Sequence, residues 1–274
     1  MIRALGLLVV AALAAAFPAA ARADRSYGAV GSGGGDLVTL RLSDSGRSLR
    51  ALTMRVELRC AQGGVAPFAG TLRVVDRLPS RIRNRALAIR RRAPRGTILV
   101  QIRARYGSKR SHVDDTGTLR IDRIGARSAR LRLSLLSIDT DYPTDPCGAN
   151  LRLGARRAPG VLYVGATSDE EPIWLRRQTA TSLEVVAGYG NQCKPTGWME
   201  GLFFDAPPLA PDGAFGWPLE TDLGVRNGFG TRGTFAGRID GARATGSLRL
   251  IGTGGPPRAK RCDTGVRTWT ATSE

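Results

Sequence analysis

Histidine, lysine and aromatic side chains are scarce in this sequence, and their scarcity excludes several kinds of active site. His112 is the only histidine, and aromatic residues make up 6% of the chain. A serine or cysteine hydrolase with a histidine base would have to use His112, which lies in a polar stretch typical of a solvated loop. The sequence has neither a Gly-x-Ser-x-Gly elbow nor a Cys-x-x-Cys pair. We therefore predict no hydrolase triad and no zinc site.

Long apolar runs are absent as well, except at the N-terminus. Met1-Ile2-Arg3 precedes an apolar stretch from Ala4 to Phe17, and a small-x-small sequence ends at Ala23. A positive charge, a short apolar run and such an ending are the three parts of a secretory signal peptide. The run is shorter than the roughly 20 residues that cross a bilayer. Residues 1–23 are therefore predicted to be a signal peptide, and the mature chain is predicted to be secreted and soluble.

Cysteine is infrequent but present in an even number. An exported chain with 4 cysteines is expected to form two disulfides, because the compartments outside the cytoplasm are oxidising. The 35 glycines and 15 prolines indicate many turns, and helical patterning is scarce after the signal segment.

Alternation of apolar and polar residues predicts β-strands over most of the mature chain. It is clearest in Leu52–Cys60, Ile98–Tyr106 and Ala129–Leu135. Asp240-Gly241 between two such stretches is a hairpin signal, since glycine accepts a positive φ. Strands joined by turns without helices indicate an all-β protein with antiparallel meanders. A closed barrel and a two-sheet sandwich both fit this pattern.

An internal repeat organises the chain into two halves. The first half contains Ile-Asp, Gly-Ala-Arg and Leu-Arg-Leu between Ile121 and Leu133, followed by Cys147; the second contains the same three groups between Ile239 and Leu250, followed by Cys262. Each half also begins with a tyrosine, two strand-like stretches and a cysteine. We interpret this order as a duplication, with module 1 in residues 24–158 and module 2 in residues 159–274.

The repeat also favours one disulfide pattern among the three that four cysteines permit. Equivalent positions in the two halves would join Cys60 to Cys147 and Cys193 to Cys262. Each bond would tie an early strand of its module to a late one. The alternation of the Leu52–Cys60 stretch also puts Cys60 on the apolar face, so we expect its partner to be reached through the core.

Each half of the chain resembles an uncharacterised repeat of secreted proteins from high-GC bacteria. The resemblance lies in Tyr-x-Gly near the start, a cysteine after two strands, and Cys-x-x-Gly before a strand with tryptophan. The second copy fits better, with Cys262, Gly265 and Trp269, whereas the first has Asn150 in place of the glycine and Leu153 in place of the tryptophan. The resemblance implies a β-module outside the cytoplasm and brings no activity with it.

The excess of positive over negative charge lies in the first half of the mature chain. Residues 24–158 contain 27 Lys+Arg and 11 Asp+Glu, a balance of 27 − 11 = +16, whereas residues 159–274 contain 12 of each. From Arg77 to Val113 there are twelve basic residues and no acidic one. Arginine suits phosphate, sulfate or carboxylate groups, so this run is a candidate site for an anionic polymer of the cell envelope. The alternative is a solvated face that keeps the protein soluble, and the shortage of aromatic residues argues against nucleic acid. The candidate residues are Arg81, Arg83, Arg85, Arg90, Arg91, Arg92, Arg103 and Arg105.

Other patterns are weaker. Asp139, Asp141 and Asp145 have the spacing of the first ligands of a calcium loop, but the glycine and the final glutamate are missing, so a rigid turn is the simpler interpretation. We predict no metal and no cofactor. The main function hypothesis is a non-catalytic secreted binding protein. The alternative is a secreted carbohydrate hydrolase with carboxylates in module 2, near Trp174, Trp198 or Trp217.

Overall fold

The computed structural model describes residues 24–31, 35–79, 82, 85–108, 111–122, 124–125, 127–157, 162–192, 198–222, 229–254 and 262–273. All of the regular secondary structure in these ranges is β-strand, which confirms the all-β prediction, and the described part of the chain forms no helix that could cross a membrane. The predicted signal peptide, residues 1–23, lies outside the described residues.

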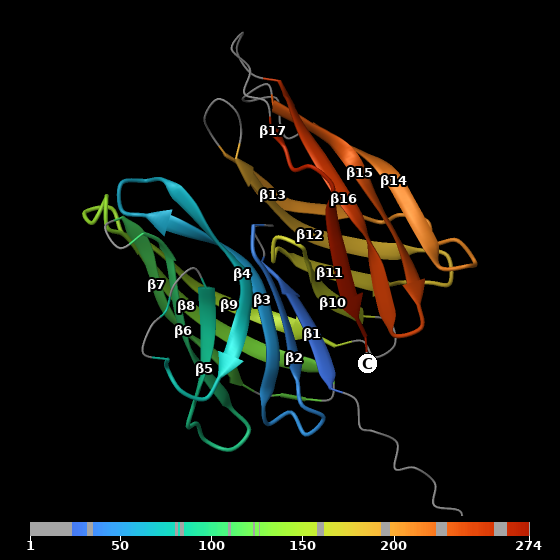
Figure 1. Ribbon diagram of the computed structural model, residues 1–274. Helices are drawn as coiled ribbons and strands as arrows, with labels where there is room; N and C mark the ends of the chain where they lie inside the picture. The colour runs from blue at the N-terminus through green and yellow to red at the C-terminus, as the bar shows by residue number, and fades with distance from the viewer. Residues whose placement is uncertain are drawn as a thin grey trace, which may run out of the picture.

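The first nine strands form a closed barrel (Figure 1). They are β1 (Arg25–Val30), β2 (Leu37–Leu42), β3 (Leu49–Cys60), β4 (Val65–Val75), β5 (Arg85–Arg91), β6 (Ile98–Gly107), β7 (His112–Asp122), β8 (Ser128–Asp139) and β9 (Cys147–Arg156). All neighbours are antiparallel except β4 and β5, which run parallel through three residue pairs, Arg73 to Val75 with Leu87 to Ile89. The expected antiparallel meander is therefore wrong at this one pair. A tight hairpin would force an antiparallel pair, but the longer connection through residues 76–84 lets β5 start at the same end as β4.

The alternation in sequence sets which side chains fill the barrel. Along β8, Ala129, Leu131, Leu133 and Leu135 are buried, while the residues between them are exposed. The same inward positions on β3 and β6 complete an interior of aliphatic side chains with Tyr27 and Phe68. Because successive strand residues point to opposite faces, every inward apolar residue fixes an outward polar neighbour.

The remaining strands form a second sheet, which is open among the described residues. They are β10 (Leu162–Thr167), β11 (Pro172–Arg177), β12 (Leu183–Gln192), β13 (Trp198–Asp205), β14 (Ala214–Asp222), β15 (Phe229–Asp240), β16 (Arg243–Gly254), β17 (Cys262–Asp263) and β18 (Arg267–Thr272). Their order is β13-β12-β11-β10-β18-β16-β15-β14, with β17 paired to β16. Its core stacks Phe235 on Trp269, with ring centroids 5.2 Å apart. The hairpin expected at Asp240-Gly241 joins β15 to β16, and Gly241 has a φ of 55° there.

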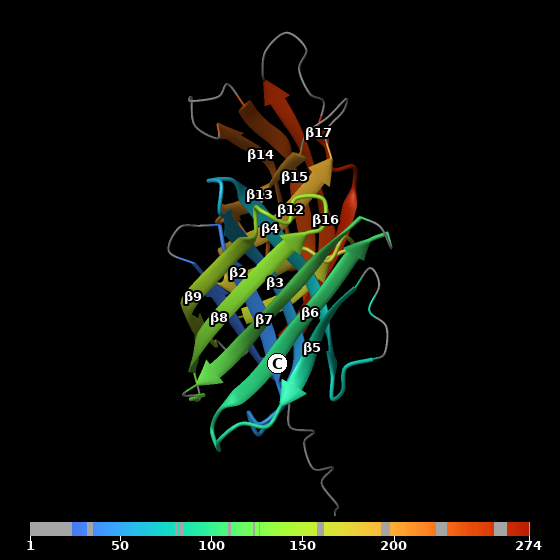
Figure 2. The same ribbon diagram turned by 90° about the vertical axis from the view of Figure 1, so that its left-hand side faces the viewer.

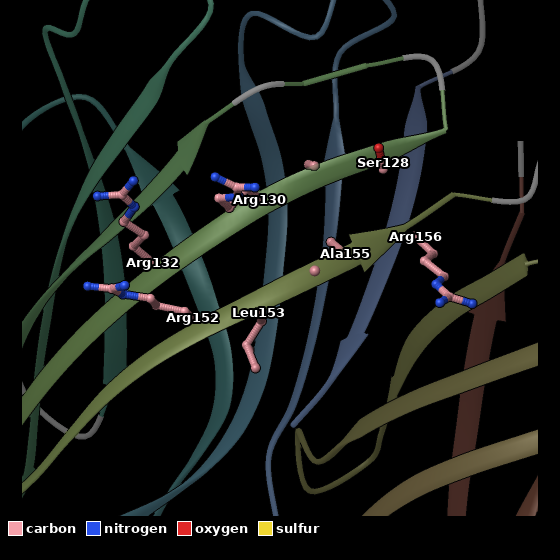
Figure 3. Close-up of a pocket in the computed structure, with 9 residues that line it drawn as sticks. Ser128, Arg130, Arg132, Arg152, Leu153, Ala155 and Arg156 are labelled. Atoms are coloured by element: carbon pink, nitrogen blue, oxygen red, sulfur yellow. The ribbon is translucent and has the colours of Figure 1, made fainter. Parts of the chain in front are cut away.

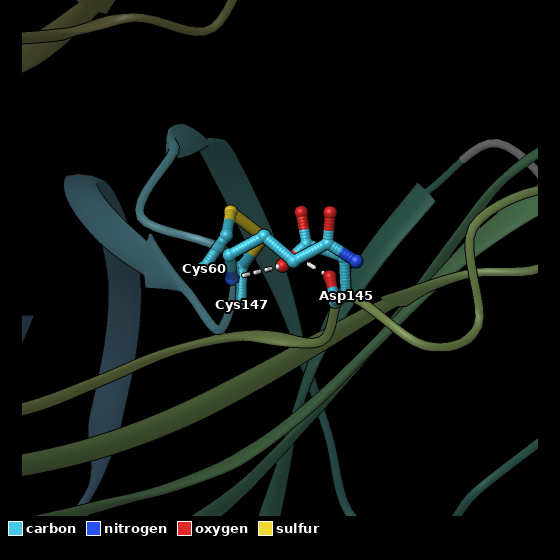
Figure 4. The surroundings of a disulfide bond; sticks show 4 residues. Cys60, Asp145 and Cys147 are labelled. Atoms are coloured by element: carbon cyan, nitrogen blue, oxygen red, sulfur yellow. Dashed lines mark hydrogen bonds between the residues drawn. A yellow bond between two sulfur atoms is a disulfide. The ribbon is translucent and has the colours of Figure 1, made fainter.

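The Cys60–Cys147 disulfide forms as expected, although its route differs from the expectation. Cys60 ends β3 and Cys147 begins β9, and the two are register partners at one end of the barrel rather than partners across its core. Asp145 supports this end, because its side chain accepts a hydrogen bond from the amide of Gln62 at 2.7 Å (Figure 4). Cys262 is also disulfide-bonded, but Cys193 lies outside the described residues, so the second pairing stays a prediction.

One hydrogen bond recurs at equivalent places in the two sheets. The hydroxyl of Tyr27 on β1 donates to the carbonyl of Gly125 at 3.2 Å, and the hydroxyl of Tyr163 on β10 donates to the carbonyl of Gly241 at 2.9 Å. Both tyrosines open their half of the chain, and both glycines belong to the repeated Gly-Ala-Arg sequence. A duplication would produce this recurrence.

The second sheet packs against the outer side of β1–β4. Trp174 of β11 is 8% exposed and lies against the backbone of Gly28. Leu37 of β2 joins Trp174 and residues of β10 and β12 in a separate apolar cluster. Beside this cluster, Arg55 of β3 forms a buried ion pair of 2.8 Å with Glu171. The other side of the barrel, formed by β5–β9, faces away from the second sheet (Figure 2).

Candidate anion-binding face

Four arginines line a surface cavity of about 570 Å³ on the outer side of β8 and β9. Arg130 and Arg132 extend from β8, and Arg152 and Arg156 extend from β9 (Figure 3). The cavity is also lined by Ala129, Leu153 and Ala155, which are buried. All four arginines are exposed. The hollow exists because Gly154, opposite Arg130, contributes no side chain, and a Cβ there would meet no atom within 4 Å.

The strand register brings arginines directly beside one another. Arg120 of β7 is opposite Arg132 of β8, and Arg132 is opposite Arg152 of β9. Adjacent strands lie roughly 4.8 Å apart, so these three residues form a row of like charges across three strands. Like charges directly opposite in a sheet are destabilising. A polyvalent anion across the row would remove that repulsion.

Among the residues that the structure describes, Asp122 provides the one carboxylate within ion-pair distance of these arginines. It accepts a hydrogen bond from Arg120 at 2.8 Å and lies 3.8 Å from Arg132. The hydrogen bond from Arg120 is the main reason why the pKa of Asp122 is below its usual value. Among the described residues, no carboxylate is within ion-pair distance of Arg130, Arg152 or Arg156. The face formed by Arg120, Arg130, Arg132, Arg152 and Arg156, hereafter the arginine face, therefore has an excess of positive charge.

The basic run expected from the sequence lies beside this face, and much of it is already paired. Arg105 donates to both oxygens of Asp114, and Arg90 pairs with Asp76 at 2.7 Å. Arg91 donates to the side chain of Gln101. These partners use the donors that an anionic ligand would need. The run is therefore a weaker anion site than its charge count indicated.

The rest of the run is divided between the barrel surface and undescribed positions. Arg85 is exposed on β5 opposite Arg105, Arg103 is half-buried on β6, and Arg92 is exposed after β5. Arg81 and Arg83 lie outside the described residues. Since β5 to β9 are consecutive around the barrel, Arg85 and Arg103 border the same outer surface as the arginine face.

The arginine face itself was not predicted, although its sequence signal is plain. Ala129 to Leu133 and Leu151 to Ala155 each alternate apolar residues with arginine or glycine. Once one face of a strand is apolar, the other must be outward, so the arginines of these stretches had to share the surface. What the sequence could not give was the register, which makes Arg120, Arg132 and Arg152 neighbours.

Within the described residues, the features named for a carbohydrate hydrolase or a histidine-based hydrolase are not found together. Trp174 is buried between the two sheets, so it is not available to stack on a sugar. The side chains of Trp198 and Trp217 lie outside the described residues. His112 is 3.4 Å from Asp114 on the barrel surface, and no serine or cysteine side chain of the described ranges is hydrogen-bonded to its imidazole.

The aspartates with calcium-like spacing have structural contacts instead. Asp139 accepts a hydrogen bond from the amide of Asp141, and Asp145 accepts one from Gln62. Within the described ranges, no cluster of histidine, cysteine and acidic side chains could hold a metal ion.

Comparison with known proteins gives no further guide. No family model, no curated protein and no solved structure matches this chain.

Proposed function

We propose that this chain is a secreted, non-catalytic protein that binds an anionic polymer of the cell envelope through the arginine face of its barrel. The observation that carries the proposal is the row formed by Arg120, Arg132 and Arg152. Arg130 and Arg156 lie on the same face, and Asp122 is the one carboxylate paired with it in the described part of the chain. Arginine forms bidentate contacts with phosphate and carboxylate groups, and several such contacts on one surface select a ligand with repeated charges.

The distribution of charge along the chain also supports this proposal. The bias of the barrel toward arginine is absent from the second half of the chain, where the balance is zero. A need for solubility alone would not concentrate charge on one side of one barrel. The predicted signal peptide and the Cys60–Cys147 disulfide support a location outside the cytoplasm, where wall and envelope polymers supply such ligands.

Binding to inorganic polyphosphate tests the proposal. Titration at low and high salt should give an affinity that falls steeply as salt rises, because the contacts are ionic. The triple change Arg130→Ala, Arg132→Ala and Arg152→Ala should weaken binding by about 100-fold, since three charge-assisted contacts are lost.

A matched control removes three exposed arginines from the second sheet, Arg232, Arg238 and Arg243, and should leave the affinity unchanged. Equal losses of affinity in the two triple variants would mean that polyphosphate binding depends only on the net charge of the protein. That result, or the absence of salt-dependent binding by the intact protein, would overturn the proposal.

A further inference from the structure

Two aliphatic side chains lie exposed on the same strand that provides the centre of the arginine face. Leu136 is 43% exposed and Ile138 is 37% exposed, and both occupy outward positions of β8. The outward residues that precede them on this strand are Ser128, Arg130, Arg132 and Ser134. The outer surface of β8 therefore changes from cationic to apolar along its length.

The neighbouring strands leave these two side chains uncovered. Leu136 is opposite Thr116 on β7 and Gly148 on β9, and Gly148 has no side chain to pack over it. Ile138 is opposite Asp114, whose carboxylate turns to Arg105. The pair therefore borders neutral or already paired groups, while Arg130 and Arg132 of the arginine face lie farther along the same strand.

The spacing suits a ligand with a charged and an apolar part. Arg132 and Leu136 are four residues apart on one strand, which corresponds to roughly 13 Å at 3.3 Å per residue. An anionic headgroup held by Arg130, Arg132 and Arg152 would thus place an attached alkyl chain over Leu136 and Ile138. A purely hydrophilic polymer would gain nothing from those two residues.

We infer that the ligand of the arginine face is an anionic amphiphile, in which phosphate groups are joined to acyl chains, and that the protein binds it at a lipid surface. This inference rests on the proposed function and names the class of its ligand. Phosphate groups contact the arginines, and the first methylenes of the acyl chains contact Leu136 and Ile138.

Vesicles of phosphatidylglycerol in phosphatidylcholine, with polyphosphate as the hydrophilic probe, test the inference. The double change Leu136→Thr and Ile138→Thr keeps two residues that favour strands but removes the apolar surface. We expect it to weaken binding to the vesicles by about tenfold and to leave polyphosphate binding unchanged. The control Val266→Thr alters an aliphatic residue that is more exposed, at 69%, and lies between β17 and β18; it should change neither affinity.

The outcomes separate this inference from the proposed function. The inference of an amphiphilic ligand is wrong if the double variant binds vesicles as tightly as the unchanged protein. It is also wrong if the intact protein binds polyphosphate but no vesicles. In both cases the polyanion proposal stands. Vesicle binding that survives loss of the three arginines also overturns the inference. If neither probe binds, both proposals fail. Thermal unfolding confirms that each variant is folded, and Ile138→Thr alone replaces the double change if that variant is not.

Discussion

Two neighbouring aspartates of β7 show how burial sets the charge of a single residue. Asp114 points outward, and its hydrogen bonds with Arg105 lower its pKa. Asp115 points into the barrel and is 5% exposed, so burial raises its pKa to about 6, against an opposing hydrogen bond from Ser137. Burial is also the main cause that raises the pKa of Tyr106 to about 12, with added effects from Asp115 and Glu170.

Asp115 should make the protein less stable as pH rises. Its pKa of about 6 in the folded state exceeds the unfolded value of about 3.9, so the folded state binds the proton more tightly. The free energy of unfolding should therefore fall between about pH 4 and pH 6, by about 2 to 3 kcal/mol from this residue. Asp115→Asn should remove that fall and raise stability at pH 8, as measured by urea unfolding across pH.

Asp114→Asn provides the contrasting measurement for the same strand. The pKa of Asp114 is lowered by Arg105, so its contribution to stability is present at neutral pH and is lost as pH falls through the folded pKa. Similar pH profiles for the two variants would show that the position of a carboxylate relative to the barrel wall does not decide its titration.

Asp122 should restrain binding rather than assist it. Because its pKa is lowered mainly by the hydrogen bond from Arg120, it stays charged well into the acid range and neutralises part of the arginine face. Asp122→Asn should tighten polyphosphate binding several-fold, since one repulsive charge is removed. Asp212→Asn, which removes an exposed carboxylate paired with Arg238 in the second sheet, should not. Weaker binding by Asp122→Asn would show that Asp122 instead holds the arginines in position for the ligand.

Among the elements, the turn between β10 and β11 brings two carboxylates to the barrel. Glu171 pairs with the buried Arg55, and the carboxylate of Glu170 accepts a hydrogen bond from the amide of Thr71 at 3.3 Å. Glu170 has a φ of 65°, which is unusual for a residue other than glycine. Thr71 is available for this bond because the pairing of β4 with β5 begins only at Arg73.

Loss of the buried ion pair should therefore be costly. Glu171→Ala leaves the guanidinium of Arg55 buried without that carboxylate, and removal of one partner of a buried pair costs about 3 to 5 kcal/mol. Glu184→Ala removes the half-buried partner of Arg176, which is itself only partly buried, and should cost about 1 kcal/mol or less. Urea unfolding measures both. Equal and small losses would mean that water reaches Arg55 in solution.

Gly28 should tolerate no side chain, because a Cβ at this position would lie 2.6 Å from the indole of Trp174. Gly28→Ala should lower the melting temperature by pushing the second sheet away from β1. Gly154→Ala is the matched control, since a Cβ there meets only open space on the same barrel. An unchanged melting temperature for Gly28→Ala would show that Trp174 can move aside without loss.

At the scale of the whole molecule, the disulfide links β3 to β9 at one end of the barrel. Cys60 and Cys147 are separated by 87 residues, and closing so long a loop restricts the unfolded chain by about 4 to 5 kcal/mol in the usual entropy model. Cys60→Ala with Cys147→Ala should lower the free energy of unfolding by about that amount. Peptide mapping without reduction should also find Cys193 joined to Cys262. A bond from Cys193 to another cysteine would contradict the duplication.

The sequence was a good guide to strands and a poor guide to their neighbours. Alternation over Ile98–Tyr106 and Ala129–Leu135 located β6 and β8, because the alternation of a half-buried strand can be seen within its own sequence. No sequence pattern indicated that β4 and β5 would pair in parallel, because alternation within a strand does not show the direction of its neighbour. The arginine face was missed for the same reason. Its residues come from three strands, and only their register shows that Arg120, Arg132 and Arg152 are adjacent.

The second sheet is attached to one side of the barrel, so the molecule has two different ends. One end is the β5–β9 side of the barrel, and the other is the second sheet. Contacts with Trp174 and Glu171 occupy the β1–β4 side, so a surface-bound ligand can approach the barrel only from the β5–β9 side. When that side rests on an envelope surface, the barrel separates the second sheet from it. The neutral half of the chain is then held outward, free to meet molecules that never touch the surface itself.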